Sequence, residues 1–173
     1  MHHSSVSHPV PSQAPARVLL VSDWDVDPKA VVDAAQRQHP TAGLYLLVPA
    51  RLRGIDWVGD PYASVPCARR QLDAIVRLAP AAPLEVIDAR VGDPDQIAAI
   101  GDALADWPVQ ALLLCAPRGR VGAPYPFDLW TRARWLSGLP VARIELPTAA
   151  TWRERHGLLR LRGHCPVEQP QAA

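Results

Sequence analysis

Three aspartates, Asp23, Asp25 and Asp27, alternate along one short segment and are the first residues in the chain that could do chemistry. Closely spaced carboxylates can bind calcium or magnesium. An EF-hand counted from Asp23 needs a glycine and a glutamate at positions that hold Pro28 and Ala34, so that motif is excluded. Asp27 before a proline is typical of a helix N-cap. A magnesium pair of Asp23 and Asp25 is the less favoured alternative, and no metal cofactor is predicted.

The sequence shows no nucleophile placed beside a base. His164 and Cys165 are adjacent, and neighbours in sequence rarely reach the geometry that activates a thiol. Ser22 lacks the GxSxG elbow of hydrolases. The three cysteines are widely spaced and form no CxxC pair, so neither a disulfide framework nor a zinc site is suggested. We expect Cys115, in an apolar run, to be a buried core thiol. An enzymatic function is therefore not favoured.

The composition is that of a soluble globular protein, with 49% hydrophobic residues and a formal net charge of +1. Such a charge gives no general attraction to nucleic acid or to an anionic membrane. No apolar run approaches the roughly 18 residues that a membrane-spanning helix needs, and residues 1–16 lack the apolar core of a secretory signal. We expect a cytoplasmic protein with one α/β domain over residues 17–147, a disordered tail at 1–16 and a partly disordered extension at 148–173.

Apolar runs alternate with amphipathic segments along this domain. Nearly continuous apolar runs, typical of strands buried on both faces, lie at Arg17–Ser22, Leu44–Val48 and Ala111–Ala116. Two more strands are predicted at Val141–Leu146 and at Leu84–Val91, where alternating polar residues suit a sheet edge. Strands that alternate with helices predict a doubly wound fold, a five-stranded parallel sheet in the order 3-2-1-4-5 with helices on both faces.

Cap signals mark the helices between these strands. Asp27-Pro28 and Asp93-Pro94 each read as an N-cap followed by proline at the first helical position. Cys67–Ala79 is amphipathic, and the last helix is predicted at Asp128–Leu136 and closed by Gly138. Ligands of doubly wound folds bind beyond the carboxyl ends of the strands, where the strand order reverses. The loop that follows the first strand should therefore face Pro117–Gly122.

Four short segments, in order and at matching spacing, resemble the universal stress protein family. They are the first strand ending in Asp23, Val91-Gly92-Asp93-Pro94 with Ile97, Val109–Gly119, and Leu139-Pro140-Val141. The resemblance covers Arg17 to Leu146. It implies a universal-stress-protein-like fold, ATP or another adenine nucleotide as ligand, and dimerisation through the last strand. The nucleotide-binding positions that it implies are Asp23, Trp24, Val48, Gly92, Ala116, Arg118, Gly119, Gly122 and Asp128.

The sequence departs from the family where the phosphates would bind. Anchored on Gly119, the first glycine of the family's nucleotide loop is replaced by Ala116, and Phe127-Asp128 stands where ATP-binding members have Gly-Ser or Gly-Thr. Anchored instead on Gly119-Arg120-Val121-Gly122, the first half of the loop fits, but the final pair is still missing. A helix N-terminus binds phosphate through free N–H groups and its positive dipole end. Asp128 would cap its own helix and repel a triphosphate. Arg118 would offset only part of that repulsion, so ATP is expected to bind weakly or not at all.

These observations favour a non-catalytic, dimeric module that senses a small molecule or binds an unidentified protein partner, and that contacts neither nucleic acid nor membrane. The alternatives are a true ATP-binding protein with regulatory or slow hydrolytic activity, and an enzyme that uses the same cleft for another small molecule. The dimer is expected to form through Val141–Leu146, where Arg143 and Glu145 have opposite charges. A monomer would result if Trp152–Leu161 folded back over that edge.

Overall fold

The apolar runs of the sequence form a single sheet in the computed structural model, which describes residues 16–52, 60, 62–118 and 128–149. The elements are β1 (Arg17–Ser22), α1 (Pro28–Gln38), β2 (Gly43–Pro49), α3 (Val65–Leu78), a 3-10 turn η1 (Ala79–Ala81), β3 (Glu85–Gly92), α4 (Gln96–Asp106), β4 (Ala111–Pro117), α5 (Leu129–Ser137) and β5 (Val141–Leu146). Strands β1 and β5 have the predicted bounds.

The strand order is β3-β2-β1-β4-β5 and every pairing is parallel, which confirms the predicted topology. Val18 in the central strand lies opposite Leu44 of β2 and Ala111 of β4. The polar strand β3 is at one edge, as its alternating pattern predicted, and β5 is at the other. Parallel strands place all their carboxyl ends along one side of the sheet, where the loops converge.

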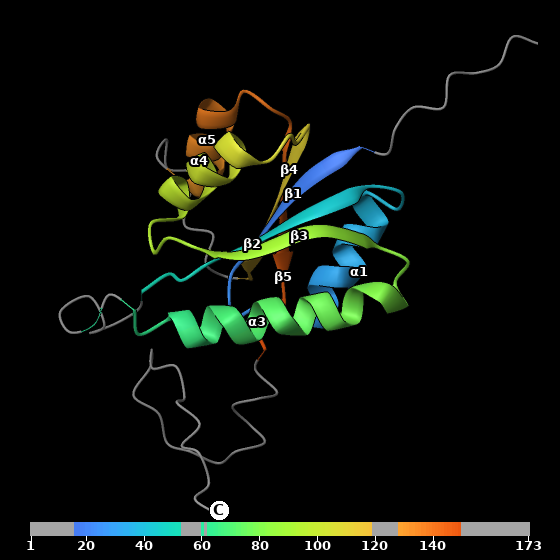
Figure 1. The fold of residues 1–173 in the computed structure, drawn as a ribbon, viewed down its shortest axis with the longest axis horizontal. Helices are drawn as coiled ribbons and strands as arrows, with labels where there is room; N and C mark the ends of the chain where they lie inside the picture. Colours follow the sequence, from blue (N-terminus) through green and yellow to red (C-terminus); the bar gives the residue numbers. More distant parts are fainter. Residues whose placement is uncertain (1–15, 53–59, 61, 119–127, 150–173) are drawn as a thin grey trace, which may run out of the picture.

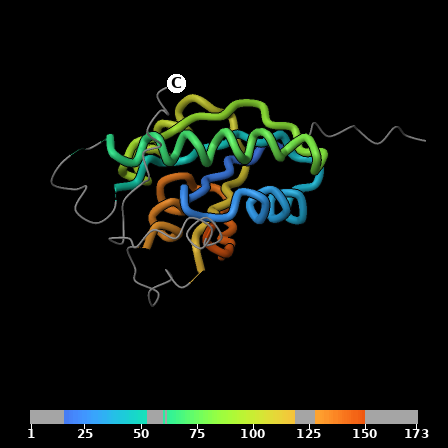
Figure 2. Tube along the Cα trace, turned by 90° about the horizontal axis from the view of Figure 1, so that it is seen from below, coloured from blue at the N-terminus to red at the C-terminus, as the bar shows by residue number. Residues whose placement is uncertain are grey.

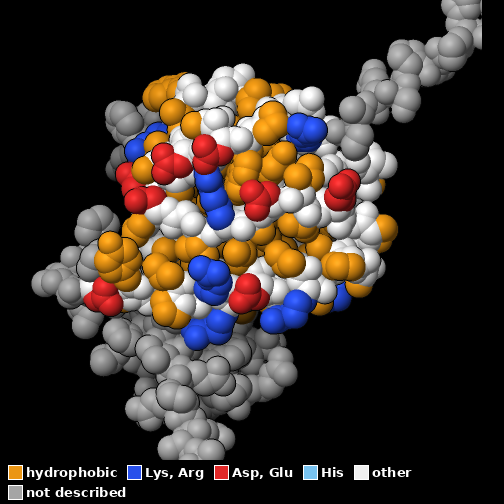
Figure 3. Space-filling view, viewed as in Figure 1, with side chains coloured by type: hydrophobic (Ala, Val, Ile, Leu, Met, Phe, Trp, Pro, Cys, Tyr) orange, Lys and Arg blue, Asp and Glu red, His pale blue; other side chains and the backbone are white. Residues whose placement is uncertain are grey.

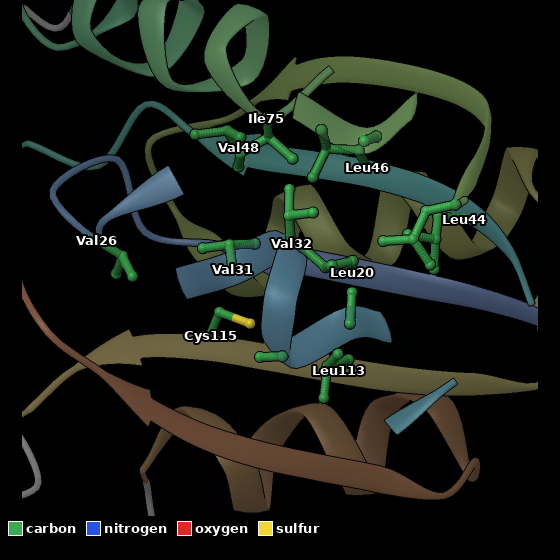
Figure 4. Close-up of a cluster of buried hydrophobic side chains, with 14 of the residues drawn as sticks. Leu20, Val26, Val31, Val32, Leu44, Leu46, Val48, Ile75, Leu113 and Cys115 are labelled. Atoms are coloured by element: carbon green, nitrogen blue, oxygen red, sulfur yellow. The ribbon is translucent and has the colours of Figure 1, made fainter. Parts of the chain in front are cut away.

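Two helical layers cover the sheet, with α1 and α3 on one face and α4 and α5 on the other (Figure 1). Figure 2, seen from below, shows α1 and α3 lying side by side in front of the sheet. Leu20, Leu46 and Val32 are among the side chains that fill the larger core, between the sheet and α1 and α3 (Figure 4). Burying each such side chain completely contributes about 1.5–3 kcal/mol.

An aspartate caps three of the helices, and one of these caps is not where the sequence predicted it. Asp27 caps α1 and Asp128 caps α5, as expected. The cap of α4 is Asp95, whose Oδ1 accepts the N–H groups of Ile97 and Ala98 at 2.8 and 3.4 Å. The prediction of Asp93 is wrong, because its Oδ1 accepts the N–H of Asp95 and so forms the turn that precedes the helix.

The cysteines differ in state. Cys115 is a free thiol in the core, and burial raises its pKa to about 12, so it is neutral at physiological pH. Cys67, for which the sequence suggested no bridge, is disulfide-bonded. None of the helices in the described part of the chain has the length and apolar composition that a membrane-spanning helix needs.

Candidate ligand-binding cleft

The carboxyl side of the sheet brings Asp23 and Arg51 together. Asp23 directly follows β1, and its N–H donates to the Cys115 carbonyl at 3.1 Å, which extends the pairing of β1 with β4. Its side chain is nearly buried, at 4% exposure, and Oδ2 lies 2.5 Å from Nη2 of Arg51. Arg51 comes from the segment after β2. A nearly buried carboxylate needs such a partner, because leaving it uncompensated would cost several kcal/mol.

The rest of the β1–α1 loop is fixed from three directions. Trp24 donates its indole N–H to the Arg51 carbonyl at 3.0 Å, so Arg51 is held by both its side chain and its backbone. Buried Gln71 of α3 donates to the Val26 carbonyl at 2.9 Å. Residues 147–149, after β5, pair with residues 25–27 through two backbone hydrogen bonds of 2.8 and 3.0 Å. The loop is therefore rigidly positioned before any ligand binds.

A cleft of about 620 Å³ opens beside this loop. It is bounded by the segment after β2, the start of α4 and the start of α5. Its lining residues are Arg51, Leu52, Tyr62, Asp93, Pro94, Asp95, Gln96, Ile97, Leu129 and Arg132. This volume is within the range of small-molecule sites. The lining combines apolar walls with a few charged groups, which is also the usual composition of such sites.

The helix N-termini that border the cleft are already capped. Asp95 accepts the first free N–H groups of α4, and Asp128 Oδ1 accepts the Thr131 N–H of α5 at 2.8 Å. Hydrogen bonds from the Thr131 side chain and backbone hold the pKa of Asp128 below its ordinary value, with a smaller contribution from Arg143. Asp128 is therefore ionised at neutral pH. A phosphate would have to displace a bonded carboxylate of the same charge.

The other predicted nucleotide positions that the structure describes lie at the carboxyl ends of β2, β3 and β4, and none of them is among the residues that line the cleft. Val48 is fully buried in the core beneath α3, where its side chain has no surface for a ligand (Figure 4). A Cβ on Gly92 would lie 2.7 Å from Ala99 Cβ, so this glycine is needed where α4 packs on the sheet. Half-buried Ala116 lies opposite Glu145 of β5. Exposed Arg118 donates its N–H to the Leu146 carbonyl.

Two of the predicted positions, Gly119 and Gly122, lie outside the described residues. Asp23 and Trp24 lie where the sequence placed them, in the loop after β1. Arg51 and Arg132 also line the cleft, and neither was predicted from the sequence. Arg51 had a detectable signal, because it follows the second buried strand and must reach the same side of the sheet as Asp23. In the described ranges, no group of three or more His, Cys, Asp or Glu side chains is placed to hold a metal ion.

Comparisons with known proteins place this geometry in context. No protein-family model matches the chain, and the search of curated proteins finds no relative. Among solved structures, a universal stress protein from Archaeoglobus fulgidus matches with a TM-score of 0.52 and 14% identity, over 75% of this chain and 93% of that one. A second universal stress protein, solved in complex with cAMP, matches with a TM-score of 0.46 and 18% identity, over 78% of this chain and 99% of that one. The fold that the sequence motifs indicated is therefore confirmed: this chain has the fold of the universal stress proteins.

Proposed function

We propose that this protein is a divergent universal stress protein that acts without catalysis, as a dimeric module that binds a small molecule or passes a signal to a protein partner. The observation that carries the proposal is the cleft at the carboxyl side of the sheet, lined by Arg51, which is paired with Asp23, and by the starts of two helices that are already capped. The fold and the volume of the cleft support binding, and the side chains support a ligand other than ATP.

The residues present do not fit a triphosphate. Asp128 accepts the Thr131 N–H, one of the groups of α5 that could otherwise bind phosphate, and its charge opposes an anion at that end of the helix. Asp23 is engaged by Arg51 and is therefore not free to bind a nucleoside. Adenine nucleotides should bind weakly or in an altered position.

The described residues also support a role without catalysis. The thiol of Cys115 is buried and neutral, so it is not a nucleophile. The carboxylates at the cleft are committed to structure, because Asp95 caps α4 and Asp93 forms the turn before it. A general base needs an unengaged side chain within reach of a substrate proton.

Dimerisation through β5 is the second part of the proposal. This strand is at a sheet edge and alternates in its exposure, with Leu146 buried and Arg143 and Glu145 exposed. Within one chain Arg143 lies 3.4 Å from Asp128 and 3.8 Å from Glu145. An edge strand of this kind can pair with its own copy around a two-fold axis.

Binding is tested by denaturing the purified protein and identifying released small molecules by mass spectrometry, together with calorimetric titration of ATP and magnesium. We expect a small molecule that is not ATP, and weak or absent ATP binding. A low-micromolar affinity for ATP would overturn the proposal.

A double variant tests whether the Asp128 cap, and not another part of the cleft, limits ATP binding. Changing Phe127→Gly and Asp128→Ser introduces the glycine and serine that ATP-binding members carry, and removes the charge. Affinity for ATP should then rise. Asp27→Ser is the matched control, because it changes the cap of α1, which is not part of the cleft lining. Equal ATP affinity in wild type and the double variant would show that Asp128 is not the obstacle.

A further inference from the structure

The hydrogen-bonding groups that line the cleft differ in how far they are satisfied. Oδ1 of Asp95 accepts two backbone N–H groups, and Oδ1 of Asp93 accepts one. The Nε and Nη2 atoms of Arg51 are buried, and Nη2 is ion-paired with Asp23, but the Arg51 side chain keeps 28% exposure and lines the cleft. A guanidinium carries five N–H donors, so the part of it that faces the cleft can still bind a ligand. The cleft therefore has donor groups to offer and acceptors that are partly occupied.

Arg132 adds a second guanidinium to the lining. It lies in the first turns of α5, is exposed, and forms no ion pair or side-chain hydrogen bond with another described residue. Its guanidinium is therefore available to pair with a bound anion through its N–H donors, without displacing the Asp128 cap at the start of the helix.

The remaining walls of the cleft are apolar. Ile97 at the start of α4 and Leu129 at the start of α5 are half-buried, and Leu52 and the exposed ring of Tyr62 complete the surface. A small inorganic anion would leave these side chains in contact with water. A ligand with an apolar body would cover them and gain the burial of that area.

We propose that the cleft binds a small organic anion, with one carboxylate or phosphate group held by Arg51 and Arg132 and a ring or chain lying against Ile97 and Leu129. This inference rests on the proposed function, because it assigns a ligand class to the same cleft. It requires neither a free helix N-terminus nor a metal ion. Arginine holds a carboxylate or a phosphate through paired N–H donors, so both head groups satisfy the same chemistry.

The test uses the full chain and three probes with the same ring system: 1-naphthoate, 1-naphthyl phosphate and the neutral 1-naphthalenemethanol. Binding is measured by calorimetric titration at 50 mM and 500 mM salt. We expect the better anion to bind at least about tenfold more tightly than the neutral alcohol, since a hydrogen bond to a charged group corresponds to about a tenfold effect or more. The comparison of the two anions distinguishes a carboxylate site from a phosphate site. High salt should weaken only the anions.

Arg132→Gln is the principal variant, because Arg132 is exposed and its loss should not affect folding. It should reduce anion affinity about tenfold and leave the affinity for the alcohol unchanged. The double variant Asp23→Asn with Arg51→Gln removes the nearly buried ion pair without leaving a single charge, and should act in the same direction. Arg77→Gln, at the exposed end of α3, is the matched control and should change nothing.

The outcomes separate this inference from the proposed function. If all three probes bind with equal affinity, and Ile97→Trp abolishes their binding by filling the cleft, the cleft is a ligand site but the anion proposal is wrong. If no probe binds to wild type, the anion proposal fails, and an empty result in the mass spectrometry of released ligands would remove the proposed function as well.

Discussion

Each edge of the sheet has a tryptophan and an arginine beside it, but the outward backbone groups of the two edge strands differ in their hydrogen bonding. At each edge a tryptophan donates its indole N–H to the edge strand and an arginine lies over its ring. Beside β3, Trp107 donates to the Asp88 carboxylate at 3.1 Å, with the Arg90 guanidinium 4.3 Å from the ring centre. Beside β5, Trp130 donates to the Val141 carbonyl at 3.0 Å, with the Arg134 guanidinium 5.6 Å from the ring centre.

At the β3 edge, a side chain of the strand itself forms a hydrogen bond with an outward backbone group. The register shifts at Ile87, which lies between the residues that pair with Leu44 and Tyr45, and this irregularity places Asp88 beside Trp107. Asp88 Oδ1 also accepts the N–H of Ala89 at 2.7 Å. The Gly92 carbonyl accepts the N–H of Ala50, directly after β2. Backbone groups alternate in direction along a parallel strand, so the N–H and C=O of Ala89 face away from the sheet. Figure 3, in the same view as Figure 1, shows that charged and apolar side chains are mixed on the side of the molecule where β3 lies.

The β5 edge is regular, because its pairing with β4 has no register shift. The carbonyls of Pro140 and Leu146 bond to β4, so the backbone groups of Val141, Arg143 and Glu145 face away from the sheet. The indole N–H of Trp130 donates to the Val141 carbonyl. Bulges and inward-turned charges are the usual protection of an edge strand. The comparison therefore favours β5 as the edge that pairs with a second copy and β3 as the edge that does not.

Trp107→Ala should have the largest effect on stability. Trp107 is nearly buried, stacks on Tyr45 with ring centres 5.1 Å apart, and links Asp88 to Arg90. Its removal should lower the free energy of unfolding by about 3–5 kcal/mol, as measured by urea denaturation. Trp135→Ala, at a residue with 69% exposure, is the control and should stay within about 0.5 kcal/mol of wild type. Equal losses in the two variants would show that the β3 edge is not held by this cluster.

Arg143→Pro should break the proposed dimer. Proline removes an outward N–H from β5, and in a two-fold dimer this deletes two backbone hydrogen bonds, worth about 1–3 kcal/mol of association. Light scattering at micromolar concentration should show a shift from dimer to monomer.

Ala89→Pro is the matched change at the other edge. It removes an outward N–H that already donates to Asp88, so it should lower stability and leave the mass of the oligomer unchanged.

Truncation after Thr148 tests the alternative in which the C-terminal extension covers β5. A wild-type monomer that remains a monomer after this truncation would refute the dimer.

The cap of α5 should have a smaller, pH-dependent effect. Asp128→Ala should lower the free energy of unfolding by about 1 kcal/mol. Because the folded pKa of Asp128 is lowered below its ordinary value of 3.8, the stabilisation is complete above that pH and is lost as the pH falls from 3.8 through the lowered pKa. Asp128→Asn keeps a capping oxygen and should lose only this acid-dependent part. Thermal unfolding between pH 2.5 and 6 measures both. A pH profile of Asp128→Asn that overlays wild type would contradict this assignment.

The sequence predicted the sheet better than the cleft, for a physical reason. Strands such as β1 and β4 are buried on both faces, so their apolar runs and order follow from local composition. The Asp23–Arg51 pair depends on two loops that meet only after the sheet has formed. The cap of α4 likewise depended on which of two aspartates accepts the first N–H groups of the helix, and in the structure it is Asp95. The alternation of apolar and charged residues in β5 could be recognised in the sequence, whereas nothing in the residue pattern of β3 indicated the bulge at Ile87.

Exchange of each edge tryptophan for phenylalanine isolates the two indole hydrogen bonds and should give the smallest effects. Trp107→Phe keeps most of the ring packing but removes the N–H that Asp88 accepts next to a nearly buried ring. Trp130→Phe frees the Val141 carbonyl at an edge that water can reach, so its loss is partly compensated. We expect the first change to cost about 0.5–1 kcal/mol more than the second in urea unfolding. In addition, Trp130→Phe should leave the β5 dimer intact or tighten it, because the freed carbonyl becomes available to the partner strand. A weaker dimer in this variant would mean that Trp130 shapes the pairing surface itself, and the difference between the two edges would then lie in packing and not in free backbone groups.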